Sequence, residues 1–387
     1  MFCSLMTRLR TPVLLVAAVL ASVLPLSAER RTAEPLSTSA STSARKRVAR
    51  PGELAAKIDA ILAANLARPL PGFSVTVMRG NSVIYAKGMG YTNIARSTAV
   101  WSESMFQVGS VTKQFTAAGI MRLAEQGKLR VDDEVTKYIP ELPTRGGVIT
   151  LRHLLNHTSG LPEYTPYLPD PYRPLGLPAM INLIKDKPMQ FAPGQSWAYG
   201  NTGFFLLAAV IERVSGKSYG TFLRDELTAP LGLLNSGYCG SATHLQPPAG
   251  YVEYYSKGTF REVAAIEPSN AFGAGGLCST STDLVRWAKA LASGGVVSSS
   301  SYASMTAPTR YGAVGLMGYG YGLSIGTLQG RRAIEHGGSI LGFESYLGHL
   351  PVEDLTIAVL VNVTIVPGEG IAAKIANEVT AAVLSSS

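Results

Sequence analysis

Charged, aromatic and cysteine residues are all scarce in this 387-residue chain, at 16%, 8% and three residues respectively. Its 46% apolar content excludes a largely disordered protein, because so apolar a chain can bury a core. Long apolar runs are scarce too, and since only one raises the question of a membrane span, a multi-span membrane protein is excluded. The length suggests two or three domain-sized units with a sizeable core.

The basic character of the chain is confined to its N-terminal part. The formal net charge is +8, but residues 1–28 carry +2 and residues 29–50 carry +4, which leaves +2 for residues 51–387. A nucleic-acid-binding body needs a basic stripe, and no such stripe is visible in the sequence. We therefore expect no nucleic-acid partner.

The single long apolar run has the order of a secretory signal. Arg8 and Arg10 precede the uncharged stretch 11–28, which ends in small residues. Eighteen uncharged residues interrupted by Pro25 are marginal for a membrane-spanning helix. We expect residues 1–28 to be a cleaved signal peptide and the protein to be exported, either periplasmic or secreted, with no span after cleavage. A retained N-terminal membrane anchor is the alternative.

Residues 29–50 have the composition of a tether. They are rich in Ser, Thr and Ala and then basic, which cannot form a core and predicts a flexible basic linker. The folded body then covers residues 51–387, where Cys239 and Cys278 are the remaining cysteines. After export these two residues form either a disulfide or two buried free thiols, and the sequence leaves both open.

The predicted secondary structure of the body changes along the chain. Strand-like runs gather near both ends, and the middle is mostly helix and loop. This pattern predicts an α/β lobe from residues 51–110 and 317–387, with a helical lobe, residues 111–316, inserted between them. Helical spacing and apolar runs predict helices over 53–66, 111–126, 151–156, 203–214, 283–292 and 370–384 and strands over 73–78, 82–86, 321–325, 342–349 and 355–363.

Several common catalytic motifs are missing. The Gly337-Gly338-Ser339 segment begins like the G-x-S-x-G elbow of α/β-hydrolases, but it lacks the final glycine. No H-E-x-x-H or C-x-x-C occurs, and His153 and His157 lack a third ligand nearby in the sequence. We therefore expect no metal and no cofactor, and we interpret the two histidines as groups that bond backbone around a turn.

Ser110 and Lys113 form the strongest candidate pair. Ser110 follows a glycine at the start of a long apolar helix, and residues three apart share one helix face. A serine hydroxyl is a poor nucleophile until a neighbouring base takes its proton. Lys113 can be that base if burial and the helix N-terminus lower its pKa from about 10.4. The same N-terminus offers backbone N–H groups to a developing oxyanion.

Two further motifs lie downstream, Tyr199-Gly-Asn201 and His336-Gly337-Gly338. Tyr199 can relay a proton to a leaving group, and Asn201 can bond both a lysine and a substrate amide. Paired glycines let a substrate approach a strand closely. His336 can donate a hydrogen bond or, when protonated, bind a carboxylate.

In this order, the three motifs resemble the signatures of the penicillin-recognising serine hydrolases. The similarity is to the branch of class C β-lactamases, D-alanyl-D-alanine carboxypeptidases and related esterases, and it spans roughly residues 52–385. It includes the neighbouring segments 151–161, 193–197 and 274–279. The resemblance implies an α/β, β-lactamase/transpeptidase-like fold: an antiparallel sheet flanked by helices, an inserted all-helical region, and a cleft between the lobes.

The resemblance also implies a role for each motif residue. Ser110 would be the acylated nucleophile, Lys113 and Tyr199 would share proton transfer, and Asn201 would orient the lysine and the substrate. The backbone N–H groups of Ser110 and Ser339 would form the oxyanion hole. Which of Lys113 and Tyr199 takes the first proton stays open at this point.

One departure from the family pattern bears on the substrate. The family's β-lactamases usually carry Lys-Thr-Gly at the third motif, where this chain has His336-Gly-Gly. A permanently charged lysine suits a β-lactam carboxylate better than a mostly neutral imidazole does. The sequence therefore favours an exported D-amino-acid peptidase, carboxypeptidase or esterase over a class C-like β-lactamase. A non-catalytic penicillin- or wall-fragment-binding sensor is the alternative from another class. The partner would be a small-molecule or peptide substrate, whose acyl group the sequence does not identify, and no pattern indicates the oligomeric state.

Overall fold

The computed structural model describes most of the folded body. The predicted signal peptide and linker, residues 1–50, lie outside the described residues. The described ranges are 51–66, 71–143, 147–241, 245–254, 259–366 and 370–386.

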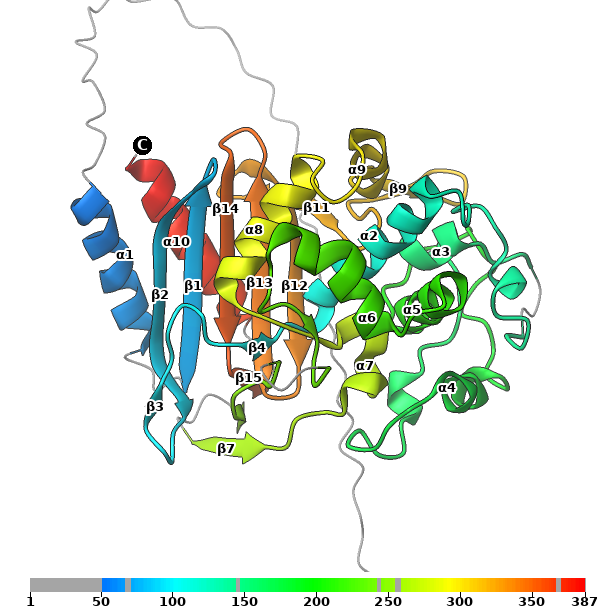
Figure 1. The fold of residues 1–387 in the computed structure, drawn as a ribbon, viewed down its shortest axis with the longest axis horizontal. Helices are drawn as coiled ribbons and strands as arrows, with labels where there is room; N and C mark the ends of the chain where they lie inside the picture. The colour runs from blue at the N-terminus through cyan, green and yellow to red at the C-terminus, as the bar shows by residue number, and fades with distance from the viewer. Residues whose placement is uncertain are drawn as a thin grey trace, which may run out of the picture.

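A seven-stranded antiparallel sheet occupies one half of the molecule, in the order β11-β12-β13-β14-β1-β2-β3 (Figure 1). β1 pairs with both β2 and β14, so segments from the two ends of the body share one sheet, which confirms the expected antiparallel α/β fold. The strands are β1 (Gly72–Arg79), β2 (Ser82–Asn93), β3 (Thr98–Ala99), β11 (Ser324–Leu328), β12 (Arg331–Ile340), β13 (Phe343–Leu350) and β14 (Leu355–Val361).

Both faces of the central sheet are covered by other parts of the chain. Every residue of β14 is buried: Ile357 and Val359 pack with α1 (Pro51–Leu66) and α10 (Ile371–Ser385), whereas Leu360 belongs to the other core cluster. That other cluster includes α8 (Ser281–Ala292), which packs against β1, β13 and β14. The helix predicted at 283–292 therefore covers one face of the sheet, because both sheet faces need a cover. Its Trp287 also stacks on Phe115 of the helix that follows Ser110.

The other half of the molecule is mostly helical (Figure 1). In α5, residues 202–211 are all buried, as expected of a helix that is apolar all round and lies in a core. None of the helices in the described part of the chain is long and apolar enough to cross a membrane. The helices here are α2 (Thr112–Glu125), α3 (Leu151–Leu155), α4 (Leu177–Ile184), α5 (Thr202–Ser215), α6 (Tyr219–Leu223), α7 (Pro268–Gly275) and α9 (Ser299–Met305).

Short strands join the two halves beside the first motif. β8 pairs with β4 and with β5, and β4 ends just before Ser110. A disulfide joins Cys239 to Cys278 in β8, with their Cα atoms 5.0 Å apart, which settles the alternative left open by the sequence. The remaining strands are β4 (Phe106–Gln107), β5 (Gly237–Tyr238), β6 (Gly250–Tyr254), β7 (Phe260–Val263), β8 (Leu277–Ser279), β9 (Thr309–Tyr311), β10 (Gly315–Met317) and β15 (Val363–Val366).

The strand predicted at 321–325 begins later than expected, at Ser324. The Tyr321 N–H bonds Met305 O, and the Gly320 N–H bonds Leu323 O, so this stretch turns against the end of α9 before the strand starts.

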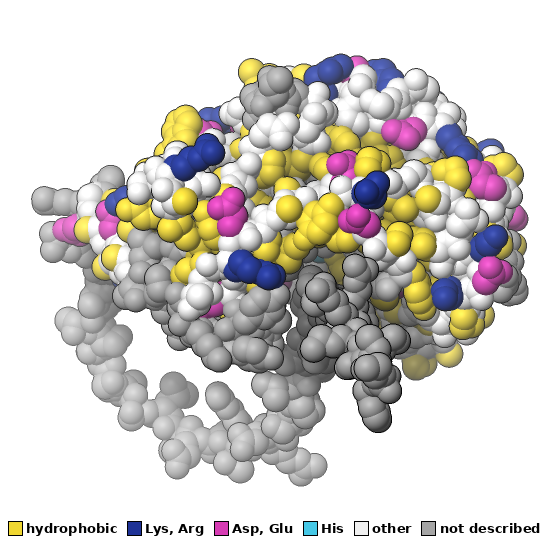
Figure 2. All heavy atoms as spheres, turned by 90° about the horizontal axis from the view of Figure 1, so that it is seen from below, with side chains coloured by type: hydrophobic (Ala, Val, Ile, Leu, Met, Phe, Trp, Pro, Cys, Tyr) yellow, Lys and Arg dark blue, Asp and Glu magenta, His cyan; other side chains and the backbone are white. Residues whose placement is uncertain are grey.

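On the face shown in Figure 2, basic side chains stand singly among acidic and apolar ones, in keeping with the small net charge of the body.

Candidate active site

Ser110 lies in a 3-10 turn, η1 (Gly109–Val111), that runs directly into α2. Gly109 has a positive φ of 50°, and a Cβ on it would lie 3.0 Å from the Ser339 nitrogen. A Cβ on Gly338 would lie 2.1 Å from Val108 O and 3.1 Å from the Ser110 nitrogen. Glycines at these two positions therefore let the serine turn and β12 touch, and they bring the amides of Ser110 and Ser339 into one small region.

Lys113 is fully buried and faces three acceptors. Its Nζ lies 3.0 Å from Ser110 Oγ, 2.9 Å from Asn201 Oδ1 and 2.9 Å from Ala274 O. Burial lowers the pKa of Lys113 to about 7, and the negative charge of Glu163 opposes that shift. When the amine is neutral, its two N–H groups can bond Asn201 and Ala274, and its lone pair can accept the Ser110 proton.

Tyr199 also contacts Ser110. Desolvation of its hydroxyl raises the pKa of Tyr199 well above the usual value, and a hydrogen bond with Ser110 opposes the rise. The residue as a whole is 41% exposed, so its ring borders solvent while its phenolic end is enclosed by protein. Its ring centroid is 4.8 Å from Lys113 Nζ. At neutral pH the phenol therefore keeps its proton while the lysine can release its own.

Asn201 precedes α5, and a carboxylate outside the three motifs holds it. Asn201 Nδ2 donates to Glu163 Oε1 over 3.3 Å, and the Asn201 backbone N–H donates to Glu163 Oε2 over 2.5 Å. The sequence prediction missed Glu163, because a single acidic residue in a loop has no distinctive pattern. Two points could have indicated it: Glu163 comes just after segment 151–161, and the N-terminus of a helix such as α5 attracts anions.

His336 is buried, and both of its ring nitrogens bond to other groups of the protein. Nε2 lies 2.9 Å from Tyr319 Oη, and Nδ1 lies 2.5 Å from Gly337 O. Burial, with a contribution from the Lys113 charge, lowers the pKa of His336 to about 3. The imidazole is therefore neutral, with Nδ1–H donating to the carbonyl and Nε2 accepting from Tyr319. In this arrangement His336 offers no positive charge to a substrate carboxylate.

Beyond His336, β12 has one paired and one unpaired side. β13 pairs with it through Gly337, Gly338 and Ser339, whereas β11 pairs with it only as far as Glu335 in the described residues. Gly338 and Ser339 in this stretch lie against the η1 turn. This free stretch of strand edge can bond an extended substrate backbone beside Ser110.

The two histidines considered as metal ligands instead bond backbone. His157 Nδ1 accepts the Gly200 N–H over 3.4 Å, and its carbonyl accepts the Ala198 N–H, so His157 holds the Tyr199 loop. His153 Nδ1 accepts the Thr150 N–H over 3.3 Å. Among the described residues, no group of three or more His, Cys, Asp or Glu is placed to hold a metal.

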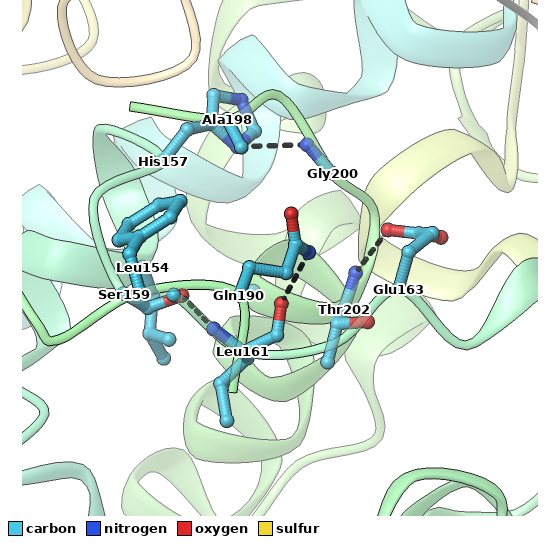
Figure 3. A pocket seen from close by; sticks show the side chains of 12 residues that line it. Leu154, His157, Ser159, Leu161, Glu163, Gln190, Ala198, Gly200 and Thr202 are labelled. Atoms are coloured by element: carbon cyan, nitrogen blue, oxygen red, sulfur yellow. Dashed lines mark hydrogen bonds between the residues drawn. The ribbon is translucent and has the colours of Figure 1, made fainter. Parts of the chain in front are cut away.

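A cavity lies behind the Tyr199 loop (Figure 3). Its volume of about 20 Å³ accommodates about one water molecule, so it is too small for a substrate. The residues around it include Leu154, His157, Glu163, Gln190, Gly200 and Thr202.

Comparison with known proteins places the chain in a family. The family model described as Beta-lactamase matches residues 54–381. Penicillin-binding protein 4* of Bacillus subtilis (strain 168) is 29% identical over 71% of this chain and 64% of its own length. The D-aminopeptidase of Gluconobacter oxydans (strain 621H) is 26% identical over 79% of this chain and 59% of its own length. The chain thus spans less than two thirds of these curated relatives.

A solved structure agrees with the fold. The D-stereospecific amidohydrolase from Streptomyces sp. is 27% identical, with a TM-score of 0.66, and the match covers 80% of this chain and 94% of that chain. The family model covers nearly the whole described body, and the sheet and helices match the expected architecture. This chain belongs to the β-lactamase family, within the serine hydrolase superfamily, as the resemblance indicated.

Proposed function

We propose that this protein hydrolyses D-amino-acid amides or peptides through an acyl-enzyme on Ser110. One observation carries the proposal: a fully buried lysine with a pKa near 7 lies 3.0 Å from the hydroxyl of Ser110. A buried charge is costly, and here it stands beside a potential nucleophile. A purely structural role does not explain why a lysine is buried beside this serine.

The geometry supports Lys113 as the first base. Its neutral amine takes the Ser110 proton while Oγ attacks the substrate carbonyl carbon. The backbone N–H groups of Ser110 and Ser339 stabilise the oxyanion. Tyr199 gives its proton to the leaving nitrogen and recovers one from Lys113, so the C–N bond breaks and the acyl group stays on Oγ. Attack of water on the ester then releases the acid and restores Ser110.

The substrate class follows from the third motif and from the relatives. Since neutral His336 supplies no charge, a carboxylate on the leaving side gains little there, which disfavours β-lactams and C-terminal D-amino acids. Two relatives are named D-aminopeptidase and D-stereospecific amidohydrolase. Together these points favour an amide of a D-amino acid, or an ester, over a penicillin.

We also propose that the protein is exported. The order of Arg8, Arg10 and the apolar stretch supports a signal peptide, and the Cys239–Cys278 disulfide suits an oxidising compartment. Intact mass of the protein from the envelope fraction and the medium tests this proposal. A mature N-terminus near residue 29 is expected, an uncleaved chain in the membrane indicates the anchor, and a full-length chain confined to the cytoplasm contradicts export.

The catalytic proposal is tested with four substrates: a D-aminoacyl p-nitroanilide, a D-Ala-D-Ala peptide, a p-nitrophenyl ester and nitrocefin. We expect the anilide and the ester to be turned over fastest, with acyl adducts mapped to Ser110. Ser110→Ala should lose at least about 10³-fold in kcat, while Ser304→Ala, an exposed serine on α9, keeps the rate. Equal rates for Ser110→Ala and the parent would contradict the proposal. One acylation per molecule without turnover would instead identify a sensor.

A further inference from the structure

Glu163 lies outside the three motifs, yet both of its carboxylate oxygens contact the segment that carries Asn201. Oε2 accepts the N–H groups of Asn201 and Thr202 over 2.5 and 3.4 Å. Oε1 accepts Asn201 Nδ2 over 3.3 Å and Thr165 Oγ1 over 2.9 Å. Figure 3 shows the carboxylate beside Thr202 at the start of α5.

This contact changes the task of the Asn201 side chain. An asparagine just before a helix usually caps it with its own side-chain oxygen. Here Asn201 makes no such bond, and its side-chain oxygen faces Lys113 instead. Glu163 accepts the N–H groups of Asn201 and of Thr202, the first residue of α5. The Asn201 amide is therefore left to bond Lys113.

The carboxylate also decides which way that amide points. A carboxylate only accepts hydrogen bonds, so the NH₂ end of Asn201 must face Glu163 and the oxygen must face Lys113. A flipped amide would put NH₂ against the N–H groups of the lysine and an oxygen against the carboxylate. A continuous chain of polar contacts thus runs from Glu163 through Asn201 and Lys113 to Ser110.

We propose that Glu163 is a positioning residue, which orients the Asn201 amide toward Lys113 and places one negative charge behind it. The inference rests on the proposed acylation of Ser110. Glu163 touches neither Lys113 nor Ser110 in any hydrogen bond of the described residues, so it acts through Asn201 and through its charge.

The surroundings of Lys113 make the charge of Glu163 matter. The other titratable groups that face the amine are Tyr199, His157 and His336. Desolvation raises the pKa of Tyr199 and lowers the pKa of each histidine, so all three are uncharged at neutral pH. Glu163 raises the pKa of Lys113 against the larger lowering by burial.

The test compares the parent with Glu163→Gln, Glu163→Asp and a matched control, Glu125→Gln. Glu125 resembles Glu163 because it accepts a backbone N–H and a hydroxyl at the start of α9, from Ser298 and Ser301. It lies twelve residues beyond Lys113 on α2, about 18 Å along the helix axis. The measured quantity is the rate of Ser110 acylation by p-nitrophenyl acetate from pH 5 to pH 9, with the unfolding temperature recorded for each variant.

Removing the charge at 163 should shift the pH profile and lower its plateau. For Glu163→Gln we expect the acid limb of the pH–rate profile to move about one pH unit lower, because the lost charge no longer raises the pKa of Lys113. The plateau rate should fall about tenfold, because the new NH₂ faces N–H groups. Glu163→Asp keeps the charge but is one methylene shorter, so the limb should stay in place while the plateau falls. Glu125→Gln should lower only the unfolding temperature.

The outcomes separate this inference from the function on which it rests. An unchanged limb in Glu163→Gln, or an equal shift in Glu125→Gln, would overturn the role of Glu163. If the Gln variant does not fold, Glu163→Asp decides, and a parental plateau in that variant refutes the orienting role. A parent that never forms a Ser110 adduct overturns the proposed function itself and the inference with it.

Discussion

The buried lysine should make the stability of this protein depend on pH in a way that a single substitution removes. Lys113 has an ordinary pKa of 10.5 in the unfolded chain and about 7 in the folded one. Between these values the unfolded state binds more protons, so the free energy of unfolding rises with pH. The cost of burying the amine is nearly absent above pH 10.5, grows as the pH falls toward 7, and is complete below pH 7.

The magnitude follows from the two pKa values. One unit of pKa shift corresponds to about 1.4 kcal/mol, so the lysine costs the fold about 5 kcal/mol at pH 6 and about 1 kcal/mol at pH 10. Lys113→Met removes this cost but leaves Asn201 Oδ1 and Ala274 O without their donor, at about 1–3 kcal/mol each. Whether Lys113→Met raises or lowers the free energy of unfolding at any one pH depends on these offsetting effects. The change of that difference with pH does not depend on them.

Urea unfolding of the parent and Lys113→Met at pH 6, 8 and 10 measures this trend. The stability of the variant relative to the parent should fall by about 4 kcal/mol from pH 6 to pH 10. Lys374→Met, at an exposed lysine on α10, controls for the loss of any lysine. A difference that stays constant with pH, or one that Lys374→Met reproduces, would refute the assignment of a neutral buried amine.

Three further predictions concern Tyr199, Gly338 and the disulfide. Tyr199→Phe should slow hydrolysis of a D-aminoacyl amide about 10²–10³-fold but affect a p-nitrophenyl ester much less, because nitrophenolate leaves without a proton; equal losses on both would contradict proton donation by Tyr199. Gly338→Ala should lower acylation at least about tenfold, because its Cβ would lie 2.1 Å from Val108 O, and parental rates would show that β12 need not touch the serine turn. Replacing Cys239 and Cys278 together by alanine should lower the free energy of unfolding by up to about 4 kcal/mol for a 39-residue separation, measured against the oxidised parent, and an unchanged value would show that the bridge adds no stability.

Periodicity and apolar runs were sufficient to locate most of the fold. The hairpin of β1 and β2 and the long helix α2 follow from local patterns. Two β-rich runs flank Arg79-Gly80-Asn81, and a long, largely apolar stretch ends at Gly127. The short strands β4, β5 and β8 have two or three residues each, which is too few to show a period. The packing of α8 on the sheet depends on the need to cover the second face of the sheet, which no local pattern shows.

The candidate site was predictable wherever chemistry forces a residue type and a spacing. The structure brings Ser110, Lys113 and Asn201 within hydrogen-bond reach, and places Tyr199 beside them. Glu163 was not predictable, because a positioning carboxylate needs only to reach the start of α5, and many loop positions satisfy that condition. The neutrality of His336 was equally hidden, since it depends on burial and on Tyr319, seventeen residues away.

The histidine of the third motif also limits how much positive charge the site can hold. Lys113 lowers the pKa of both His157 and His336 by its own charge, on top of the larger effect of burial. A proton on any one of the three therefore discourages a proton on the others, and Lys113, with the highest pKa, takes it. A permanently charged lysine at position 336 would be a like charge close to Lys113 and would push its pKa lower. Because His336 is neutral, burial and the charge of Glu163 set the pKa of Lys113. The residue at position 336, in the third motif, therefore affects the pKa of the lysine in the first motif.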